Sequence, residues 1–251
     1  SFPFQPSNPL RRSVAGLWKA NTDLLDTIID KLSRGDAVPA TSIMEKELQV
    51  RRLIDQSRNL FSARPRSTTR MKAAHYDQML ELRKTASLFA ASVSSMHEEL
   101  ELLNTRALQT NQDISFYKTL SAFAQASARM AVAIFTLRPE DLAMARIRVG
   151  RCDVAVELFI KAIRGLQLSE KEEDALQHFT SSLYHGLEYF NTALRQLEAK
   201  LELQKSAYFE NYKLSFHDFM AGIRPNALGS LLREWLNFNS RQFRYALRVA
   251  L

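Results

Sequence analysis

The chain has 251 residues, a formal net charge of +7 and a single cysteine, Cys152. One cysteine excludes a disulfide framework and fits a reducing compartment, and no apolar run reaches the roughly 18 residues of a membrane-spanning helix. The 7 Gly and 7 Pro residues lie mostly between periodic segments, so the composition predicts an all-helical protein with short connections.

The N-terminal part of the chain predicts two helices. Residues 9–32 carry apolar side chains at helical spacing. A second helix is predicted to start at an N-cap formed by Thr41 or Ser42, because Glu45 stands at capping-box distance. It should run to about Phe61, where the apolar periodicity ends.

The middle of the chain predicts three more helices. The third covers about residues 68–103, with apolar positions three and four apart. The fourth should start at a cap provided by Asp113 and run through Ile134. The fifth begins with Pro139 in its first turn, where proline and acidic residues are favoured, and should extend through Leu166.

The sixth helix is predicted to be the longest. Ser169 and Glu172 form a capping-box signature at its start. A heptad stripe follows, which indicates packing along the whole helix: Leu176, Leu183, Phe190 and Leu197, interleaved with Leu187, Leu194, Leu201 and Tyr208. We therefore expect an elongated antiparallel bundle of about six long helices with a coiled-coil-like hairpin. Whether the stripe packs within one chain or across a homo-oligomer stays open.

Both ends of the chain carry features of a membrane junction. We expect a linker over residues 1–9, a soluble bundle over 10–224, and over 225–251 an amphipathic elbow followed by the start of a transmembrane helix. The elbow's apolar face would be Leu228, Leu231, Leu232 and Trp235. Arginines at both ends predict cytoplasmic junctions near anionic headgroups: Arg11, Arg12, Arg241, Arg244 and Arg248.

A cluster of arginines in the second helix and the segment after it allows two interpretations. Its members are Arg51, Arg52, Arg58, Arg64, Arg66 and Arg70. They either attract carboxylate ligands towards a pore entrance or only keep the surface solvated. No helix-turn-helix, zinc or RNA-binding signature accompanies the charge, so we expect no nucleic-acid partner.

The sequence contains no recognisable catalytic motif. Neither a Glu-x-x-His pair, a P-loop, nor a nucleophile elbow occurs. His178 and His185 are a heptad apart and should point to solvent rather than ligate a metal. Cys152 is either activated by the neighbouring Arg151 or inert in the core. We therefore expect no catalytic residues, no metal and no cofactor, and no enzyme.

Three stretches resemble the soluble segment between the two membrane halves of the fusaric-acid-resistance (FUSC) family, which includes YccS-like inner-membrane proteins. The first is residues 9–25, and the second is residues 51–64 followed by 77–89. The third is residues 240–251, where the family often has His in place of Tyr245. Residues 105–225 carry no part of the resemblance beyond their helical character.

The resemblance implies a bacterial inner-membrane transporter, for efflux of aromatic or other organic acids, with this segment on the cytoplasmic side. Its partners would be the chain's own transmembrane halves and an anionic lipid surface, and its role coupling, gating or assembly. An independent helical module, which binds proteins or membrane surfaces through the basic patch, is the alternative. A metal-dependent or enzymatic bundle is the third hypothesis.

Overall fold

The computed structural model describes residues 9–62, 70–103 and 115–222, with side chains in the last range up to Ala199. The chain divides into two compact units, Ser1–Lys200 and Leu201–Leu251, and the last helix passes from one into the other. The expected boundary at residue 224 lies outside the described residues. All of the packing below lies within the first unit.

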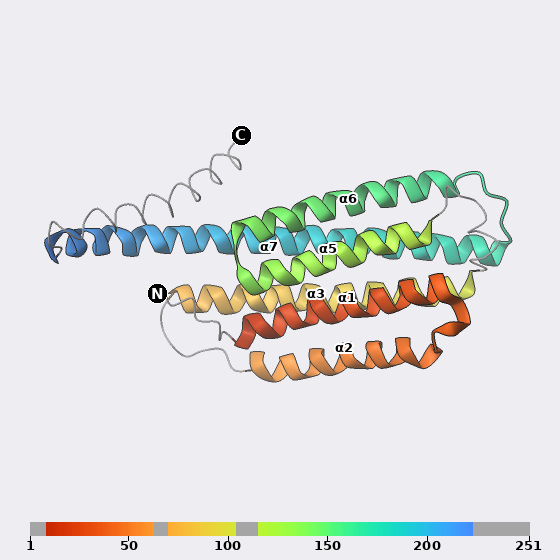
Figure 1. The fold of residues 1–251 in the computed structure, drawn as a ribbon, viewed down its shortest axis with the longest axis horizontal. Helices are drawn as coiled ribbons and strands as arrows, with labels where there is room; N and C mark the ends of the chain where they lie inside the picture. Colours follow the sequence, from red (N-terminus) through yellow and green to blue (C-terminus); the bar gives the residue numbers. More distant parts are fainter. Residues whose placement is uncertain (1–8, 63–69, 104–114, 223–251) are drawn as a thin grey trace. The chain divides into compact units, whose positions relative to one another are not determined.

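The described residues form six α-helices, which confirms the all-helical prediction (Figure 1). They are α1 (Pro9–Arg34), α2 (Ala40–Phe61), α3 (Arg70–Leu102), α5 (Phe116–Thr136), α6 (Pro139–Ile163) and α7 (Glu170–Gly222), with a short 3₁₀ turn, η1 (Gly35–Ala37), after α1. Within the first unit, successive helices run in opposite directions, so α1 and α3 are parallel to each other (Figure 1).

Four helices meet at an aromatic core to which each contributes one ring. Trp18 of α1 stacks on Phe89 of α3 with 5.1 Å between ring centroids. Phe190 of α7 lies 4.6 Å from Phe89 and 5.6 Å from Phe123 of α5. All four side chains are fully buried. Burial of such rings dominates core energetics, so this cluster holds α1, α3, α5 and α7 together.

Buried polar side chains tie α1 to its two neighbours. The Asn21 amide donates a hydrogen bond to the Ala86 carbonyl of α3 (3.2 Å). The Thr22 hydroxyl donates to the Ser127 hydroxyl of α5 (2.9 Å), which in turn donates to the Trp18 carbonyl (3.1 Å). Because buried polar groups need partners, these bonds fix the heights at which the helices pack.

The remaining two helices flank this core on opposite sides (Figure 1). On α2, Ile43, Val50 and Ser57 are buried at seven-residue intervals, so it presents only a narrow stripe to the core. On the other side, Phe159 of α6 makes edge-on contacts with Phe116 of α5 and Phe179 of α7. Most of the outward surface of α2 and α6 is therefore left to solvent.

The heptad stripe of α7 packs within the chain. The predicted core positions whose side chains the structure describes are all buried, namely Leu176, Leu183, Leu187, Phe190, Leu194 and Leu197. The side chains of Leu201 and Tyr208 lie outside the described part. His178 and His185 are exposed, as predicted. The capping box is also confirmed, since the Ser169 N–H donates to Glu172 and the Glu172 N–H to the Ser169 hydroxyl, both at 3.3 Å.

Two other predicted caps are wrong. Helix α2 begins two or three residues earlier than expected, with Pro39 as N-cap and no side-chain cap, so neither Thr41 nor Ser42 serves. Helix α5 is capped by Ser115, whose hydroxyl accepts the Lys118 N–H at 3.0 Å, instead of by Asp113. Helix α2 starts ahead of both of its candidate caps, whereas Ser115 stands at the N-cap position of α5 with the extended backbone that this position requires.

The ends of α6 differ in how well they follow the prediction. Pro139 occupies the first turn, as expected. The helix ends at Ile163 instead of Leu166, and Gly165 has a φ of 84°. That left-handed conformation favours glycine, so Gly165 is part of the stop rather than of the helix.

Candidate functional site

Helix α1 begins at the same end of the bundle at which α7 leaves the first unit. Lys31 lies 3.3 Å from Glu101, and Trp18 packs on Phe89, so the first turn of α1 is level with the first half of α3. At that height Thr85 of α3 donates to Gln196 of α7 at 3.2 Å. Helix α1 therefore begins at the end of the bundle where α7 passes out of the first unit.

Charge is separated along the length of the first unit. We define the basic half as the residues 9–21, 51–61, 73–90, 124–149 and 191–199, which lie at the end where α1 begins. The acidic half comprises the residues 22–34, 40–50, 91–102, 115–123, 150–163 and 170–190. The division follows from the contacts between helices, because these contacts show which residues of neighbouring helices lie at the same level along the bundle axis.

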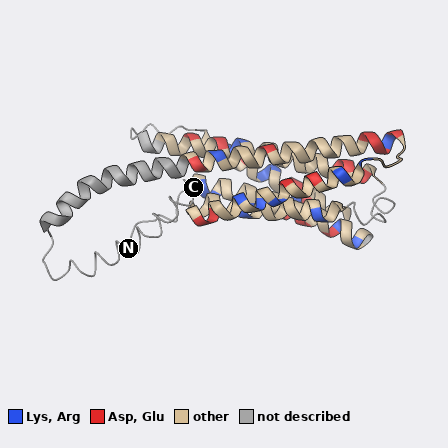
Figure 2. Cartoon of the chain, turned by 90° about the horizontal axis from the view of Figure 1, so that it is seen from above, with Lys and Arg blue, Asp and Glu red and all other residues tan. Residues whose placement is uncertain are grey.

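The two halves carry opposite charge. The basic half has thirteen Lys or Arg residues, namely 11, 12, 19, 51, 52, 58, 83, 84, 129, 138, 146, 148 and 195. Against these stand six acidic residues, namely 55, 77, 81, 140, 141 and 198. The acidic half has fifteen Asp or Glu residues against seven Lys or Arg residues, with Glu170, Glu172 and Glu173 in the first turn of α7. Figure 2 shows the acidic start of α7 at one end of the bundle.

The two predicted junction arginines of α1 lie in the basic half. Arg12 is exposed and Arg11 is half-buried. Burial lowers the pKa of the Arg11 guanidinium, because a desolvated charge is disfavoured. Arg11 thus combines a positive charge with packing at the point where the helical unit begins, as long basic side chains do at interfaces.

The predicted basic patch is only partly assembled. Arg51 and Arg52 are exposed on α2. Arg58 is also exposed but pairs with Asp55 at 3.5 Å. Arg64 and Arg66 lie outside the described residues; Arg70 begins α3, with its side chain outside the described part. The described members form a row along α2 rather than a pocket, which fits a solvated surface.

An arginine that the sequence did not single out lies beside this row. Arg83 of α3 donates from Nε to the Ser57 hydroxyl (2.6 Å) and from Nη2 to the Ile54 carbonyl (3.2 Å). Its guanidinium also lies 5.9 Å from the centre of the Phe61 ring. Burial, and then the positive charge of Arg58, lower the pKa of Arg83. The signal in the sequence is a charge among the apolar positions of α3.

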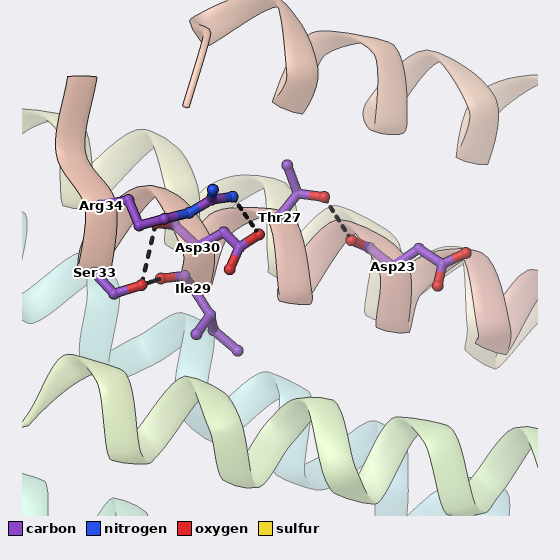
Figure 3. Close-up of polar contacts among 6 residues, drawn as sticks. All are labelled: Asp23, Thr27, Ile29, Asp30, Ser33 and Arg34. Carbon is purple, nitrogen blue, oxygen red and sulfur yellow. Dashed lines mark hydrogen bonds and ion pairs between the residues drawn. The ribbon is translucent and has the colours of Figure 1, made fainter. Parts of the chain in front are cut away.

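Figure 3 shows the polar contacts in the C-terminal half of α1, which is part of the acidic half. Asp30 pairs with Arg34 at 3.0 Å, and the Thr27 hydroxyl donates to the Asp23 carbonyl at 2.8 Å. Asp26 lies between Asp23 and Asp30 on the helix. Burial raises the pKa of Asp26, and the two neighbouring carboxylates raise it further. The negative charges of Asp23 and Asp30 therefore add to the effect of burial and favour the protonated form of Asp26.

Where α1, α2 and α3 meet in the acidic half, a histidine lies between two carboxylates. His97 Nδ1 is 3.8 Å from Glu47, and Nε2 is 3.3 Å from Glu101, which Lys31 also contacts. The Glu47 contact joins α3 to α2 and the Lys31 contact joins α1 to α3, whereas His97 and Glu101 are neighbours on α3. The described residues hold no group of three or more side chains placed to share a metal ion.

Cys152 is packed in the core, with no exposed surface. Burial raises the pKa of its thiol well above the ordinary value, and the neighbouring Asp153 raises it further. Activation by Arg151 is therefore wrong, because the thiolate is the form that burial disfavours. The thiol acts as a small apolar side chain.

The residues predicted to form the C-terminal membrane junction lie outside the described residues. They are Leu228, Leu231, Leu232, Trp235, Arg241, Arg244 and Arg248. Among the helices that the structure describes, none combines the length and the hydropathy that crossing a bilayer requires. Comparison with known proteins found no matching family model, curated protein or solved structure.

Proposed function

We propose that the first unit is a cytoplasmic coupling, gating or assembly domain of a FUSC-like bacterial inner-membrane transporter, and that its basic half faces the membrane. The observation that carries the proposal is the coincidence of the basic half with the end where α1 begins and α7 leaves. A domain inserted between two membrane halves needs both crossing points on one side. The transported substrates would be aromatic or other organic acids, as the resemblance implies.

The size of the charge separation is sufficient to orient the unit. Each Lys or Arg near an anionic leaflet contributes about 1 kcal/mol of attraction. The 26 residues of α1 span about 39 Å, so each half is about 20 Å long. That is about two Debye lengths at 0.1 M salt. With the basic half at the surface, the acidic half is screened from the negative lipid.

The proposed role is not catalytic. The unit's partners would be the chain's own transmembrane halves and the anionic lipid surface. The alternative, an independent module that binds membrane surfaces or proteins, draws support from Arg51 and Arg52, which are exposed and make no ion pair in the described part of the chain. The two proposals differ in the affinity that they require of the isolated chain.

Orientation at a lipid surface is the first test. In a Cys152→Ala background, a polarity-sensitive dye is attached at Ala199→Cys in the basic half or at Glu173→Cys in the acidic half, both exposed positions. With phosphatidylglycerol vesicles at low salt, we expect the Ala199→Cys dye to respond and the Glu173→Cys dye not to. Phosphatidylcholine vesicles are the control. Equal responses, or a response only at Glu173→Cys, would contradict the proposed orientation.

Salt dependence separates the two functional proposals. A domain that transmembrane halves hold at the membrane needs only weak lipid contact of its own, so binding should vanish at physiological salt. Binding that survives there would support the independent module. The native gene product gives the second test, because apolar stretches of about 20 residues before Ser1 and after Leu251 are needed for two membrane halves. Their absence would overturn the transporter proposal.

A further inference from the structure

Helix α6 is apolar on two opposite faces. Its inner face is buried and includes Val149, Cys152 and Val156. On the opposite face, Ile147, Val154 and Leu158 are 50%, 55% and 60% exposed. Their spacing of seven and four residues places them on one line along the helix. We call this line, with Ala143 at its start, the outer stripe.

The outer stripe has the composition of a helix-pairing surface. Branched Ile and Val with Leu, at heptad spacing, are the residues that pack between helices. Gly150 lies beside the stripe, is exposed, and has open space where a side chain would stand. A backbone without a side chain lets a second helix approach closely, as small residues do at helix contacts.

The residues of the outer stripe are arranged symmetrically about one point. Ile147 and Val154 are equally distant in sequence from the midpoint between Gly150 and Arg151. Ala143 and Leu158 are centred on the same midpoint, and so are Glu140 and Lys161. An antiparallel copy of α6, turned about this point, would place each residue opposite its counterpart. Apolar residues would then meet apolar residues, and Glu140 would meet Lys161.

Charge supports the antiparallel direction at two scales. Glu140 and Lys161 are exposed and form no ion pair within the described part of the chain, so both are available to a partner. A parallel pair would instead place Glu140 opposite the second copy's Glu140 and Lys161 opposite its Lys161, so like charges would meet. In addition, the midpoint of the stripe coincides with the boundary between the basic and acidic halves on α6. An antiparallel pair therefore places each basic half beside an acidic half.

We propose that the outer stripe of α6 binds the same stripe of a second copy of this chain, antiparallel, about a twofold axis between Gly150 and Arg151. The interface is isologous, as closed dimers require. One contact opposes it, because the two copies of Arg151 lie close to the axis on the same edge. Pairing and membrane attachment both use the basic half, so they are alternative states of the unit.

The first test is sedimentation equilibrium of the full chain without lipid. We expect a dimer for the wild type. The double variant Ile147→Glu with Val154→Glu should raise the dissociation constant at least about tenfold, because it buries unpaired charge. The matched control is Leu88→Glu on α3, where Leu88 is also 50% exposed; it should leave the dimer intact. Circular dichroism checks that all variants keep their helix content.

Charge reversal tests the direction of the pair. Glu140→Lys alone and Lys161→Glu alone should each weaken the dimer, because each sets like charges together. The double variant Glu140→Lys with Lys161→Glu restores opposite charges and should restore the dimer. It keeps Lys at position 140, in the first turn of α6, where a basic residue opposes the helix dipole, so recovery cannot come from a more stable helix. Arg151→Ala removes the one like-charge contact and should tighten the dimer. Failure of the double variant to recover would overturn the antiparallel arrangement.

Other occupants of the stripe give distinct results. A wild-type chain that is monomeric at high concentration overturns the proposal. If a cysteine at Val154→Cys in the Cys152→Ala background is then protected from labelling, the chain's own residues 201–251 cover the stripe. The dimer measurement contains no lipid, so its failure leaves the proposed function untouched. The uncharged double variant Ile147→Ser with Val154→Ser should also be monomeric, and it should bind phosphatidylglycerol vesicles more tightly than wild type, because its basic half is no longer paired and its net charge is unchanged; equal binding would contradict the claim that the two states compete.

Discussion

At the residue scale, Gly186 marks the closest approach of α7 to its neighbours. A methyl group added there would lie 2.6 Å from Phe123 Cε1 and 3.2 Å from the Met96 methyl. Both neighbours are fully buried, so neither ring nor methyl has free space to move into. The glycine is therefore required by packing against α3 and α5, not by backbone conformation.

The substitution Gly186→Ala should lower the free energy of unfolding by about 1–3 kcal/mol, the usual cost of overpacking a core. The matched control is Gly16→Ala on α1, where nothing lies within 4 Å of the added methyl. That variant should gain about 0.5–1 kcal/mol from helix propensity. Urea denaturation measures both changes. If the Gly186→Ala protein were as stable as the Gly16→Ala protein, α7 could move away from α3 and α5 at little cost, and the claim of tight packing at Gly186 would be wrong.

Cys152 gives a stability prediction that depends on pH. In the folded chain its thiol pKa is raised well above the ordinary value of about 9.0. Above pH 9 the unfolded chain therefore loses this proton while the folded chain keeps it. The free energy of unfolding should fall as pH rises, by at most about 1.4 kcal/mol per pH unit from this group.

Cys152→Ala isolates that contribution from the titration of lysines and tyrosines. Denaturation curves at pH 7 and pH 10 should show a smaller loss for the variant than for the wild type. An equal loss in both proteins would mean that the thiol titrates normally and is reached by water in the folded state.

At the element scale, helix starts depend on single side chains. The Ser115 hydroxyl caps α5, whereas no side chain caps α2. Ser115→Ala should therefore cost about 1 kcal/mol of stability. Thr41→Ala on α2, a residue that the sequence favoured as a cap, should cost almost nothing. Thermal melts compare the two, and Ser115→Asp should retain the cap. A large loss with Thr41→Ala would contradict the structure's account of α2.

The elements themselves were the most predictable part of the fold. Helical periodicity, Pro139 in the first turn of α6 and the Ser169 capping box are local signals, and the structure confirms all three. Caps with several candidates were not predictable, because the choice between Ser115 and Asp113 depends on how the backbone enters the helix. Arg83 was missed for a related reason, since its partners Ser57 and Ile54 are on another helix.

At the scale of the whole molecule, the candidate site was the least predictable feature. The sequence shows the basic clusters on separate helices, but not that Arg12, Arg58 and Arg138 share one half of the bundle. That grouping follows from the heights at which helices pack, which contacts such as Ser127 with Trp18 determine. Conversely, the arginines from residue 51 onward looked like one patch in sequence, and the structure lays those it describes along a single helix.

Trp18 has a further consequence for experiments. Its indole is stacked between Phe89 and Phe190, is fully buried, and its N–H finds no acceptor among the described residues. An indole in such dry surroundings emits at short wavelength and shifts to the red when water arrives. When Trp235, the second tryptophan, is replaced by Phe, the fluorescence comes from Trp18 alone. Its emission wavelength then reports whether α1, α3 and α7 remain packed together.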